Sequence, residues 1–238
     1  MPSHQLISLL TSAAFITAIA TRAHRARTKE PARPAVTQPT FTYRARGGSN
    51  HIDQMLHITN PNTVDVAPVL TFTPVRGDGL VLREVRVETA YGSDRGELVL
   101  CPGTGFDVLN FSGPGAEQVA DVRVTVKELA ALPAASPADY IDAKPTRGGA
   151  AVSRFAPFDA VVLHNPHPVP VSLRVVHLVY DSPPPGASQQ VVHRTPIGGL
   201  AVVPPREDLV VPVPASTAAL IRERGAGRAV SVKTYPSR

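Results

Sequence analysis

The sequence has no tryptophan, a single cysteine and only 5% aromatic residues over 238 positions. One cysteine, Cys101, cannot form an intramolecular disulfide. Sequence patterns for phosphate loops, dinucleotide binding and the nucleophilic serine of hydrolases are also missing. A catalytic thiol needs a positioned base, and none is identifiable for Cys101, which we interpret as a small buried apolar residue. We therefore predict that the protein is not an enzyme and binds no cofactor.

The chain also lacks a basic stripe interleaved with aromatic residues, the usual sign of a nucleic-acid interface. The formal net charge is +5. Much of the excess lies near the N-terminus, where one acid, Glu30, stands among five basic residues: Arg22, Arg25, Arg27, Lys29 and Arg33. Elsewhere basic and acidic residues are interspersed. We predict a protein partner and no nucleic acid.

Proline is abundant, with 25 residues against 17 glycines, and valine-rich runs separate the prolines. Because proline cannot donate to a strand ladder, it is confined to turns, edges and strand starts. Long stretches of helix-forming residues are few, so this composition favours many short strands. We predict an all-β fold with one helix in its folded part, over residues 216–224, which Ser216 or Thr217 caps and Gly225 ends in the left-handed conformation.

Residues 6–20 carry no charge and are mostly apolar. As a helix they would span about 22 Å, short of the roughly 30 Å hydrocarbon core of a bilayer. The run suits a membrane anchor flanked by basic residues, a secretory signal that ends at Ala20, or a mitochondrial transit peptide; a buried first helix is a fourth interpretation. We predict a short hydrophobic helix within a targeting or anchor segment, residues 1–27. We expect membrane association on an unspecified side, with secretion or mitochondrial import as alternatives.

A short pattern occurs twice, about 105 positions apart. In both places an apolar segment leads into Asn-Pro, at Asn60-Pro61 and again at Asn165-Pro166, and a polar turn and Val-x-Val follow. Two further landmarks recur in the same order: Pro102-Gly103 with Pro204-Pro205, and residues 124–127 with 230–233. Three landmarks in one order predict an internal duplication with units of about 100 residues and seven or so short strands.

This duplication predicts two domains behind a proline-rich linker. The linker covers residues 28–39, and the first domain covers residues 40–129. Residues 130–150, which contain three prolines and a Gly-Gly pair, form the interdomain linker. The second domain covers residues 151–238.

The strand and turn pattern resembles the broad immunoglobulin-like class, which includes major-sperm-protein-like and chaperone-like sandwiches. The residues that carry the resemblance are Ile58-Thr59-Asn60-Pro61 with Val64 and Val66, and Pro102-Gly103 with Val108. The resemblance implies two tandem immunoglobulin-like β-sandwiches. Members of the class mostly bind partners or act as scaffolds, so it also implies a binding function.

Turns supply the candidate binding residues. We predict that the two Asn-Pro turns are exposed and contact a partner through Asn60, Pro61, Asn165 and Pro166. Arg76-Gly77-Asp78 is the tripeptide that integrins recognise, and it falls on a predicted turn that would present Arg76 and Asp78 outward on opposite sides.

Four histidines of the C-terminal half suggest a metal hypothesis: His164, His167, His177 and His193. A zinc site needs three or four converging ligands. The nearby carboxylates stand at no recognisable ligand spacing, and strand alternation places His177 opposite Val176 and Leu178, which favours a solvated or edge histidine. We predict no metal site.

Together these patterns predict a non-enzymatic, membrane-associated binding or scaffold protein that uses immunoglobulin-like sandwiches for protein–protein contact. The first alternative is a subunit of a larger organellar or envelope assembly whose N-terminal segment is a cleavable import or signal sequence. The second is a metal-dependent hydrolase built on the histidines of the C-terminal half.

Overall fold

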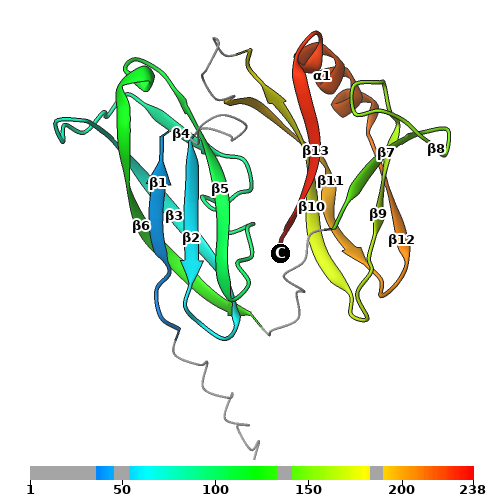
Figure 1. The fold of residues 1–238 in the computed structure, drawn as a ribbon, viewed down its shortest axis with the longest axis horizontal. Coiled ribbons are helices and arrows are strands. Elements are labelled where there is room, and N and C mark those ends of the chain that lie inside the picture. The colour runs from blue at the N-terminus through cyan, green and yellow to red at the C-terminus, as the bar shows by residue number, and fades with distance from the viewer. Residues whose placement is uncertain (1–35, 46–53, 133–140, 183–189) are drawn as a thin grey trace, which may run out of the picture. The chain divides into compact units, whose positions relative to one another are not determined.

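The computed structural model describes residues 36–45, 54–132, 141–182 and 190–238 (Figure 1). By its internal contacts the chain divides into Met1–Arg33 and a compact unit, Pro34–Arg238, to which all described residues belong. The predicted N-terminal helix and most of the predicted proline-rich linker lie outside the described residues. Within those ranges, no helix has the length and apolar character that crossing a membrane requires.

The first half of the unit, strands β1 to β6, consists of two antiparallel sheets that face each other (Figure 1). One sheet has the order β1-β2-β5-β4, from strands β1 (Thr40–Arg44), β2 (Met55–Asn60), β4 (Arg86–Thr89) and β5 (Gly103–Ser112). The other pairs β3 (Asp65–Arg76) with β6 (Val119–Leu132), which the short 3₁₀ helix η1 (Ala116–Gln118) precedes. Alternate residues of both sheets fill the core between them, among them Leu56, Ile58, Leu70, Val108 and Val122.

The second half, strands β7 to β13, has the same two-sheet arrangement. One sheet has the order β12-β9-β7-β8, from β7 (Ala143–Arg147), β8 (Ala150–Ala151), β9 (Ala160–His164) and β12 (Asp208–Pro212). The other has the order β11-β10-β13, from β10 (Val171–Tyr180), β11 (Val191–Val203) and β13 (Ala229–Pro236). Helix α1 (Ala215–Gly225) connects β12 to β13. The core between the sheets includes Val161, Leu163, Leu173, Ile197 and Val203.

Strand β10 is buried on both faces. Leu173 and Val175 belong to the core of the second half, whereas Val176, Leu178 and Tyr180 pack into the core of the first half. Successive side chains of a strand point to opposite faces, so a strand between two cores needs apolar residues at nearly every position. This explains the continuous run Val175–Tyr180, which His177 alone interrupts.

The last residues of the chain join the two halves through backbone hydrogen bonds. Val99 N donates to Pro236 O at 3.0 Å, and Arg238 N donates to Glu97 O at 3.2 Å. The Ser237 hydroxyl also donates to Glu97 O, at 2.6 Å. Together with the shared core, these bonds hold both halves in one compact unit.

The strand pairings of the two halves correspond. The order β1-β2-β5 in the first half matches β7-β9-β12 in the second, and the pair β3-β6 matches β10-β13. The match extends to single residues: Val66 bridges to Leu100, and Val171, about 105 positions later, pairs with Val203.

The prediction of an all-β fold is confirmed, and the predicted helix over residues 216–224 is α1. Two details of that helix differ. No side chain caps its start, since Pro214 occupies the N-cap position, and the left-handed residue after it is Gly227 (φ 68°), not Gly225. The segment 130–150, predicted as a linker, contributes the end of β6 and the strands β7 and β8. The division into two separate domains stays a prediction.

Candidate functional site

The first Asn-Pro turn is organised by a buried asparagine. Asn60 is only 2% exposed. Its Nδ2 donates to Val64 O at 2.9 Å and to Leu100 O at 3.0 Å, and its Oδ1 accepts from Asn62 N at 3.0 Å. The side chain therefore closes its own turn and ties the turn to the strand pair beside it.

The second Asn-Pro turn is organised in the same way. Asn165 is fully buried. Its Nδ2 donates to Val169 O at 2.8 Å and to Val203 O at 3.1 Å, and its Oδ1 accepts from His167 N at 2.9 Å. A third acceptor, Pro204 O, lies 2.9 Å from Nδ2. The expectation that both asparagines are exposed is wrong, because their polar groups satisfy backbone groups inside the fold; Pro61 and Pro166, in contrast, are exposed.

Arg76 and Asp78 do not point to opposite sides of their turn. The Arg76 guanidinium donates to both carboxylate oxygens of Asp78, with Nε 3.0 Å from Oδ1, and the Asp78 carboxylate also accepts from Leu80 N at 3.1 Å. These hydrogen bonds lower the pKa of Asp78 to about 2. Since the two side chains pair with each other, this turn does not present the separated charges that integrin recognition requires.

The histidines do not converge. His164 lies at the exposed end of β9, with Nδ1 2.6 Å from Asp208 Oδ1. His177, expected to be solvated or at an edge, is instead 1% exposed within β10, because the sheet that holds it is covered on both faces. No group of three or more His, Cys, Asp or Glu side chains in the described part of the chain is placed to hold a metal ion.

Cys101 is half-buried, and its environment opposes ionisation. Burial and the nearby Asp65 carboxylate raise the pKa of the thiol to about 11. The thiol is therefore protonated at neutral pH and a poor nucleophile.

Sequence reasoning missed a buried carboxylate, Asp107, in the middle of β5. Its two oxygens accept from three backbone groups: Tyr91 N at 2.8 Å, Ser93 N at 3.1 Å and Val108 N at 2.7 Å. Burial raises the pKa of Asp107. The side chain fixes the loop between β4 and β5, and this loop receives the last residues of the chain. No local pattern in the sequence distinguishes Asp107 from a solvated strand residue.

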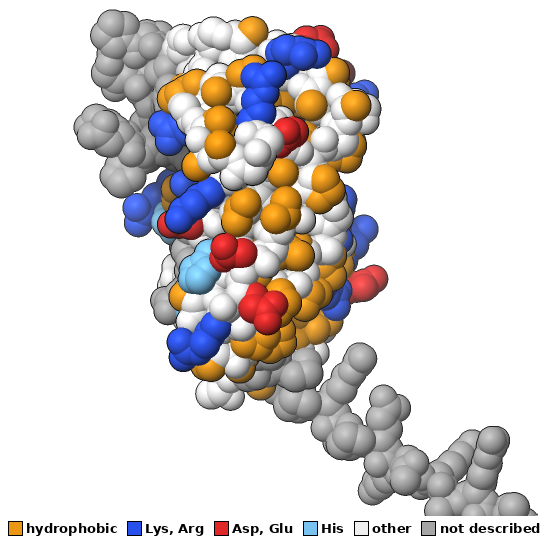
Figure 2. Space-filling model, turned by 90° about the vertical axis from the view of Figure 1, so that its right-hand side faces the viewer, with side chains coloured by type: hydrophobic (Ala, Val, Ile, Leu, Met, Phe, Trp, Pro, Cys, Tyr) orange, Lys and Arg blue, Asp and Glu red, His pale blue; other side chains and the backbone are white. Residues whose placement is uncertain are grey.

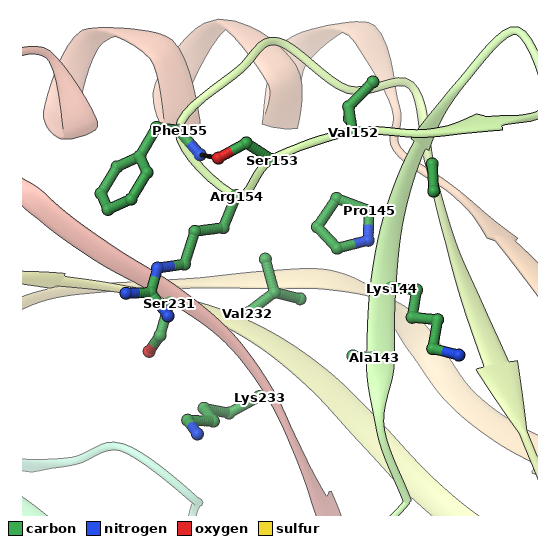
Figure 3. A pocket seen from close by; sticks show the side chains of 11 residues that line it. Ala143, Lys144, Pro145, Val152, Ser153, Arg154, Phe155, Ser231, Val232 and Lys233 are labelled. Atoms are coloured by element: carbon green, nitrogen blue, oxygen red, sulfur yellow. Dashed lines mark hydrogen bonds between the residues drawn. The ribbon is translucent and has the colours of Figure 1, made fainter.

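The outer edge of β13 borders a groove of about 450 Å³ (Figure 3). In the described part of the chain, β13 is the end strand of its sheet and pairs along its length with β10; on its other side, backbone bonding to residues 97–99 is confined to its C-terminal end. Across the groove lies β7, which belongs to the facing sheet. Figure 3 shows Val232 of β13 and Pro145 of β7 on either side of the groove, and the Arg154 side chain reaching toward Ser231. The groove thus lies between the edges of two sheets.

The lining of this groove is apolar in its interior and basic at its rim. Ala143, Pro145, Val152 and Val232 are half-buried apolar residues. Three basic residues also line the groove, namely Lys144, Arg154 and Lys233, and none of the lining residues is acidic. A segment that entered the groove would meet a strand edge, apolar walls and positive charge.

Other exposed apolar residues lie on β11 and β12. Val202 is 53% exposed, and Val210 is 59% exposed. The view from the side of the second half shows hydrophobic side chains at the surface among charges of both signs (Figure 2). Unlike the groove, this surface is not biased toward one sign of charge. It is therefore a control surface for binding experiments and not a candidate site.

No protein-family model, no curated protein and no solved structure matches the chain.

Proposed function

We propose that the protein is a non-enzymatic, membrane-associated binding protein that makes protein–protein contacts through two tandem immunoglobulin-like β-sandwiches. The strand orders support this fold. The order β1-β2-β5-β4 is the A-B-E-D order of an immunoglobulin sheet, and β3-β6 takes the place of its C-F pair. In the second half, β7-β9-β12 and β10-β13 repeat A-B-E and C-F.

The matching asparagine turns support the tandem repeat. Asn60 and Asn165 each donate to the carbonyl four residues later and each accept from the backbone N–H two residues later. Each also donates to a backbone carbonyl about 40 residues further along the chain, at Leu100 and at Val203. A buried side chain with three equivalent bonds is a more specific coincidence than a shared Asn-Pro pair.

The unpaired side of β13 carries the proposal of a binding function. In an immunoglobulin sheet, strand G pairs with strand F on the side away from C. In the second half, the segment 97–99 reaches this place only at the C-terminal end of β13, and the groove lies beside residues 231–233. An extended partner segment that adds to β13 would gain main-chain hydrogen bonds, and the apolar walls would select its side chains. The basic lining favours an acidic segment.

A photo-crosslinking side chain at Lys144, on the groove, tests this proposal in the full-length chain. We expect cross-links to an extended, acidic segment of a partner protein, and none to that segment from the same side chain at Val210. A synthetic peptide of the segment should slow amide hydrogen exchange in β13. Lys144→Glu should weaken binding of the peptide about tenfold, whereas Arg86→Glu on β4 should not. Equal cross-linking from both positions, or unchanged exchange in β13, would contradict strand addition.

Membrane association rests on the apolar run at residues 6–20 and the basic residues after it. We expect the full-length chain to keep its N-terminus, as intact mass would report, and to resist carbonate extraction. A chain without residues 1–27 should become extractable. Cleavage near Ala20 with a soluble product would indicate secretion, and cleavage after the basic residues would indicate organellar import.

A further inference from the structure

A second cavity, of about 540 Å³, lies beneath α1 and adjoins the groove at Arg154 and Phe155, which line both. Its walls include the apolar side chains of Phe158 and Val230 and the inner side of α1 at Ile221. Sites for small ligands have volumes of about 300–1,000 Å³ and mostly apolar walls with a few polar groups. The size and lining of this cavity fall within that range.

The charge around this cavity is strongly positive. Four arginines line it: Arg147 at the end of β7, Arg154 in the loop after β8, Arg222 on α1 and Arg228 just after α1. None of them is among the ion pairs of the described residues. The one acidic lining residue, Asp159, already accepts from Gly148 N at 3.0 Å. Guanidinium groups that line one cavity without a carboxylate ion-pair partner are suited to an oxyanion, which can accept two parallel hydrogen bonds from a guanidinium group.

A buried histidine completes the lining. The His177 ring is 1% exposed, and its Nδ1 has no hydrogen-bond partner among the described residues. Burial lowers the pKa of His177 to about 4, so the imidazole is neutral at pH 7. The corresponding position of the first half, about 105 residues earlier, holds Phe72, which packs against the core. A polar ring therefore stands where the first half uses an apolar one, and it borders a cavity.

Gly225 of α1 lies beside the histidine ring. A Cβ added at this residue would lie 3.3 Å from Val230 Cγ1 and 3.6 Å from His177 Cε1. Gly225 is not among the residues with positive φ, so alanine is compatible with its backbone. The absence of a side chain here leaves space next to the Cε1–Nε2 side of the ring.

We propose that this cavity binds a small organic oxyanion, a carboxylate or a phosphate ester with an aromatic or aliphatic body. The arginines bind the oxyanion, the apolar walls hold the body, and His177 makes one hydrogen bond to a polar group of the ligand. This site shares Arg154 and Phe155 with the groove beside β13, but its test does not depend on a protein partner.

Calorimetric titration of the full-length chain with four small probes of similar size tests the proposal. Phenyl phosphate and benzoate carry an oxyanion, benzyl alcohol is neutral, and benzylamine is cationic. We expect at least one of the two anions to bind tenfold or more tightly than benzyl alcohol, and no binding of benzylamine. The stronger anion distinguishes a phosphate site from a carboxylate site. Binding of neither anion, or equal binding of benzyl alcohol, overturns the proposal.

Three variants locate the binding. Arg222→Gln and Arg228→Gln should each weaken binding of the stronger anion about tenfold, the expected effect of losing one charge-assisted hydrogen bond. Gly225→Ala should reduce binding at least as much, because the added methyl group occupies the space over His177. Arg86→Gln, on β4 of the first half, is the matched control and should bind as the unchanged chain does. If Arg86→Gln and Arg222→Gln weaken binding of the anion equally, the binding reflects general charge attraction and the proposed site is overturned. If Gly225→Ala fails to fold, Arg222→Gln and Arg228→Gln still test the site.

Discussion

The Asn165 side chain makes a quantitative prediction about how the turns are held. Replacement by alanine removes four hydrogen bonds, three to backbone carbonyls and one from His167 N. Each bond of this kind contributes about 0.5–1.5 kcal/mol. Water can replace part of the more exposed ones, so we expect Asn165→Ala to lower the free energy of unfolding by about 3 kcal/mol. Asn60→Ala should lower it by a similar amount.

Urea unfolding followed by far-ultraviolet circular dichroism measures this loss, since the chain has no tryptophan to report by fluorescence. The midpoint should fall and the slope should stay unchanged, as for a pure change in stability. Asn165→Asp should cost more than alanine, because a carboxylate would face carbonyl oxygens where the amide donates. Asn110→Ala is the matched control: this asparagine is half-buried in β5, and its side chain makes no hydrogen bond within the described residues. If Asn165→Ala costs no more than Asn110→Ala, the network does not organise the turn.

Three further predictions concern the second half and its junction with the first. The folded state keeps His177 neutral by lowering its pKa from 6.5 to about 4, so stability is lost as the pH falls from 6.5 toward 4. Between pH 7 and pH 5 the free energy of unfolding should fall by at most about 2 kcal/mol for this reason. His177→Phe should remove this part of the pH dependence, and urea midpoints measured at both pH values would show it. Leu178→Ala should cost about 3 kcal/mol and leave a single unfolding transition, whereas two transitions would mean that the halves unfold independently. Deleting residues 236–238 should lower the free energy of unfolding by about 2 kcal/mol through the lost bonds to the loop before β5, and an unchanged urea midpoint would contradict that role.

The sequence predicts the strands and the two Asn-Pro turns well, because alternation, proline and asparagine act locally. The sequence does not predict that the side chains of the two asparagines point into the fold. A polar residue at the end of a strand normally faces water, so Asn60 and Asn165 were expected at the surface. Their burial depends on carbonyls at residues 100 and 203, about 40 positions away along the chain. No local pattern contains that information.

The groove and the cavity could not be predicted from the sequence either, because each combines residues that are far apart along the chain. The groove brings Ala143 and Pro145 of β7 opposite Val232 of β13, nearly 90 positions later in the sequence. The cavity joins the loop after β8, the middle of β10 and the end of α1. His177 did stand out, as the one polar residue in an apolar run, but alternation alone could not tell a covered face from an open one. Its ring lies on the face of Leu173 and Val175, and residues of the second half, among them Phe158 and Gly225, cover it there.

The proposed repeat accounts for why one half lies against the other through β10. Counted from the two buried asparagines, Thr71 and Thr73 of β3 correspond to Val176 and Leu178 of β10. Thr71 is exposed and bonds to Thr125 O on the neighbouring strand, whereas Val176 and Leu178 are buried in the core of the first half. At these two positions β3 thus carries polar side chains and β10 carries apolar ones. Because burial of a valine or leucine side chain contributes about 1.5–3 kcal/mol, the change from threonine to valine and leucine favours this face of β10, and not the corresponding positions of β3, as the surface on which the two halves join.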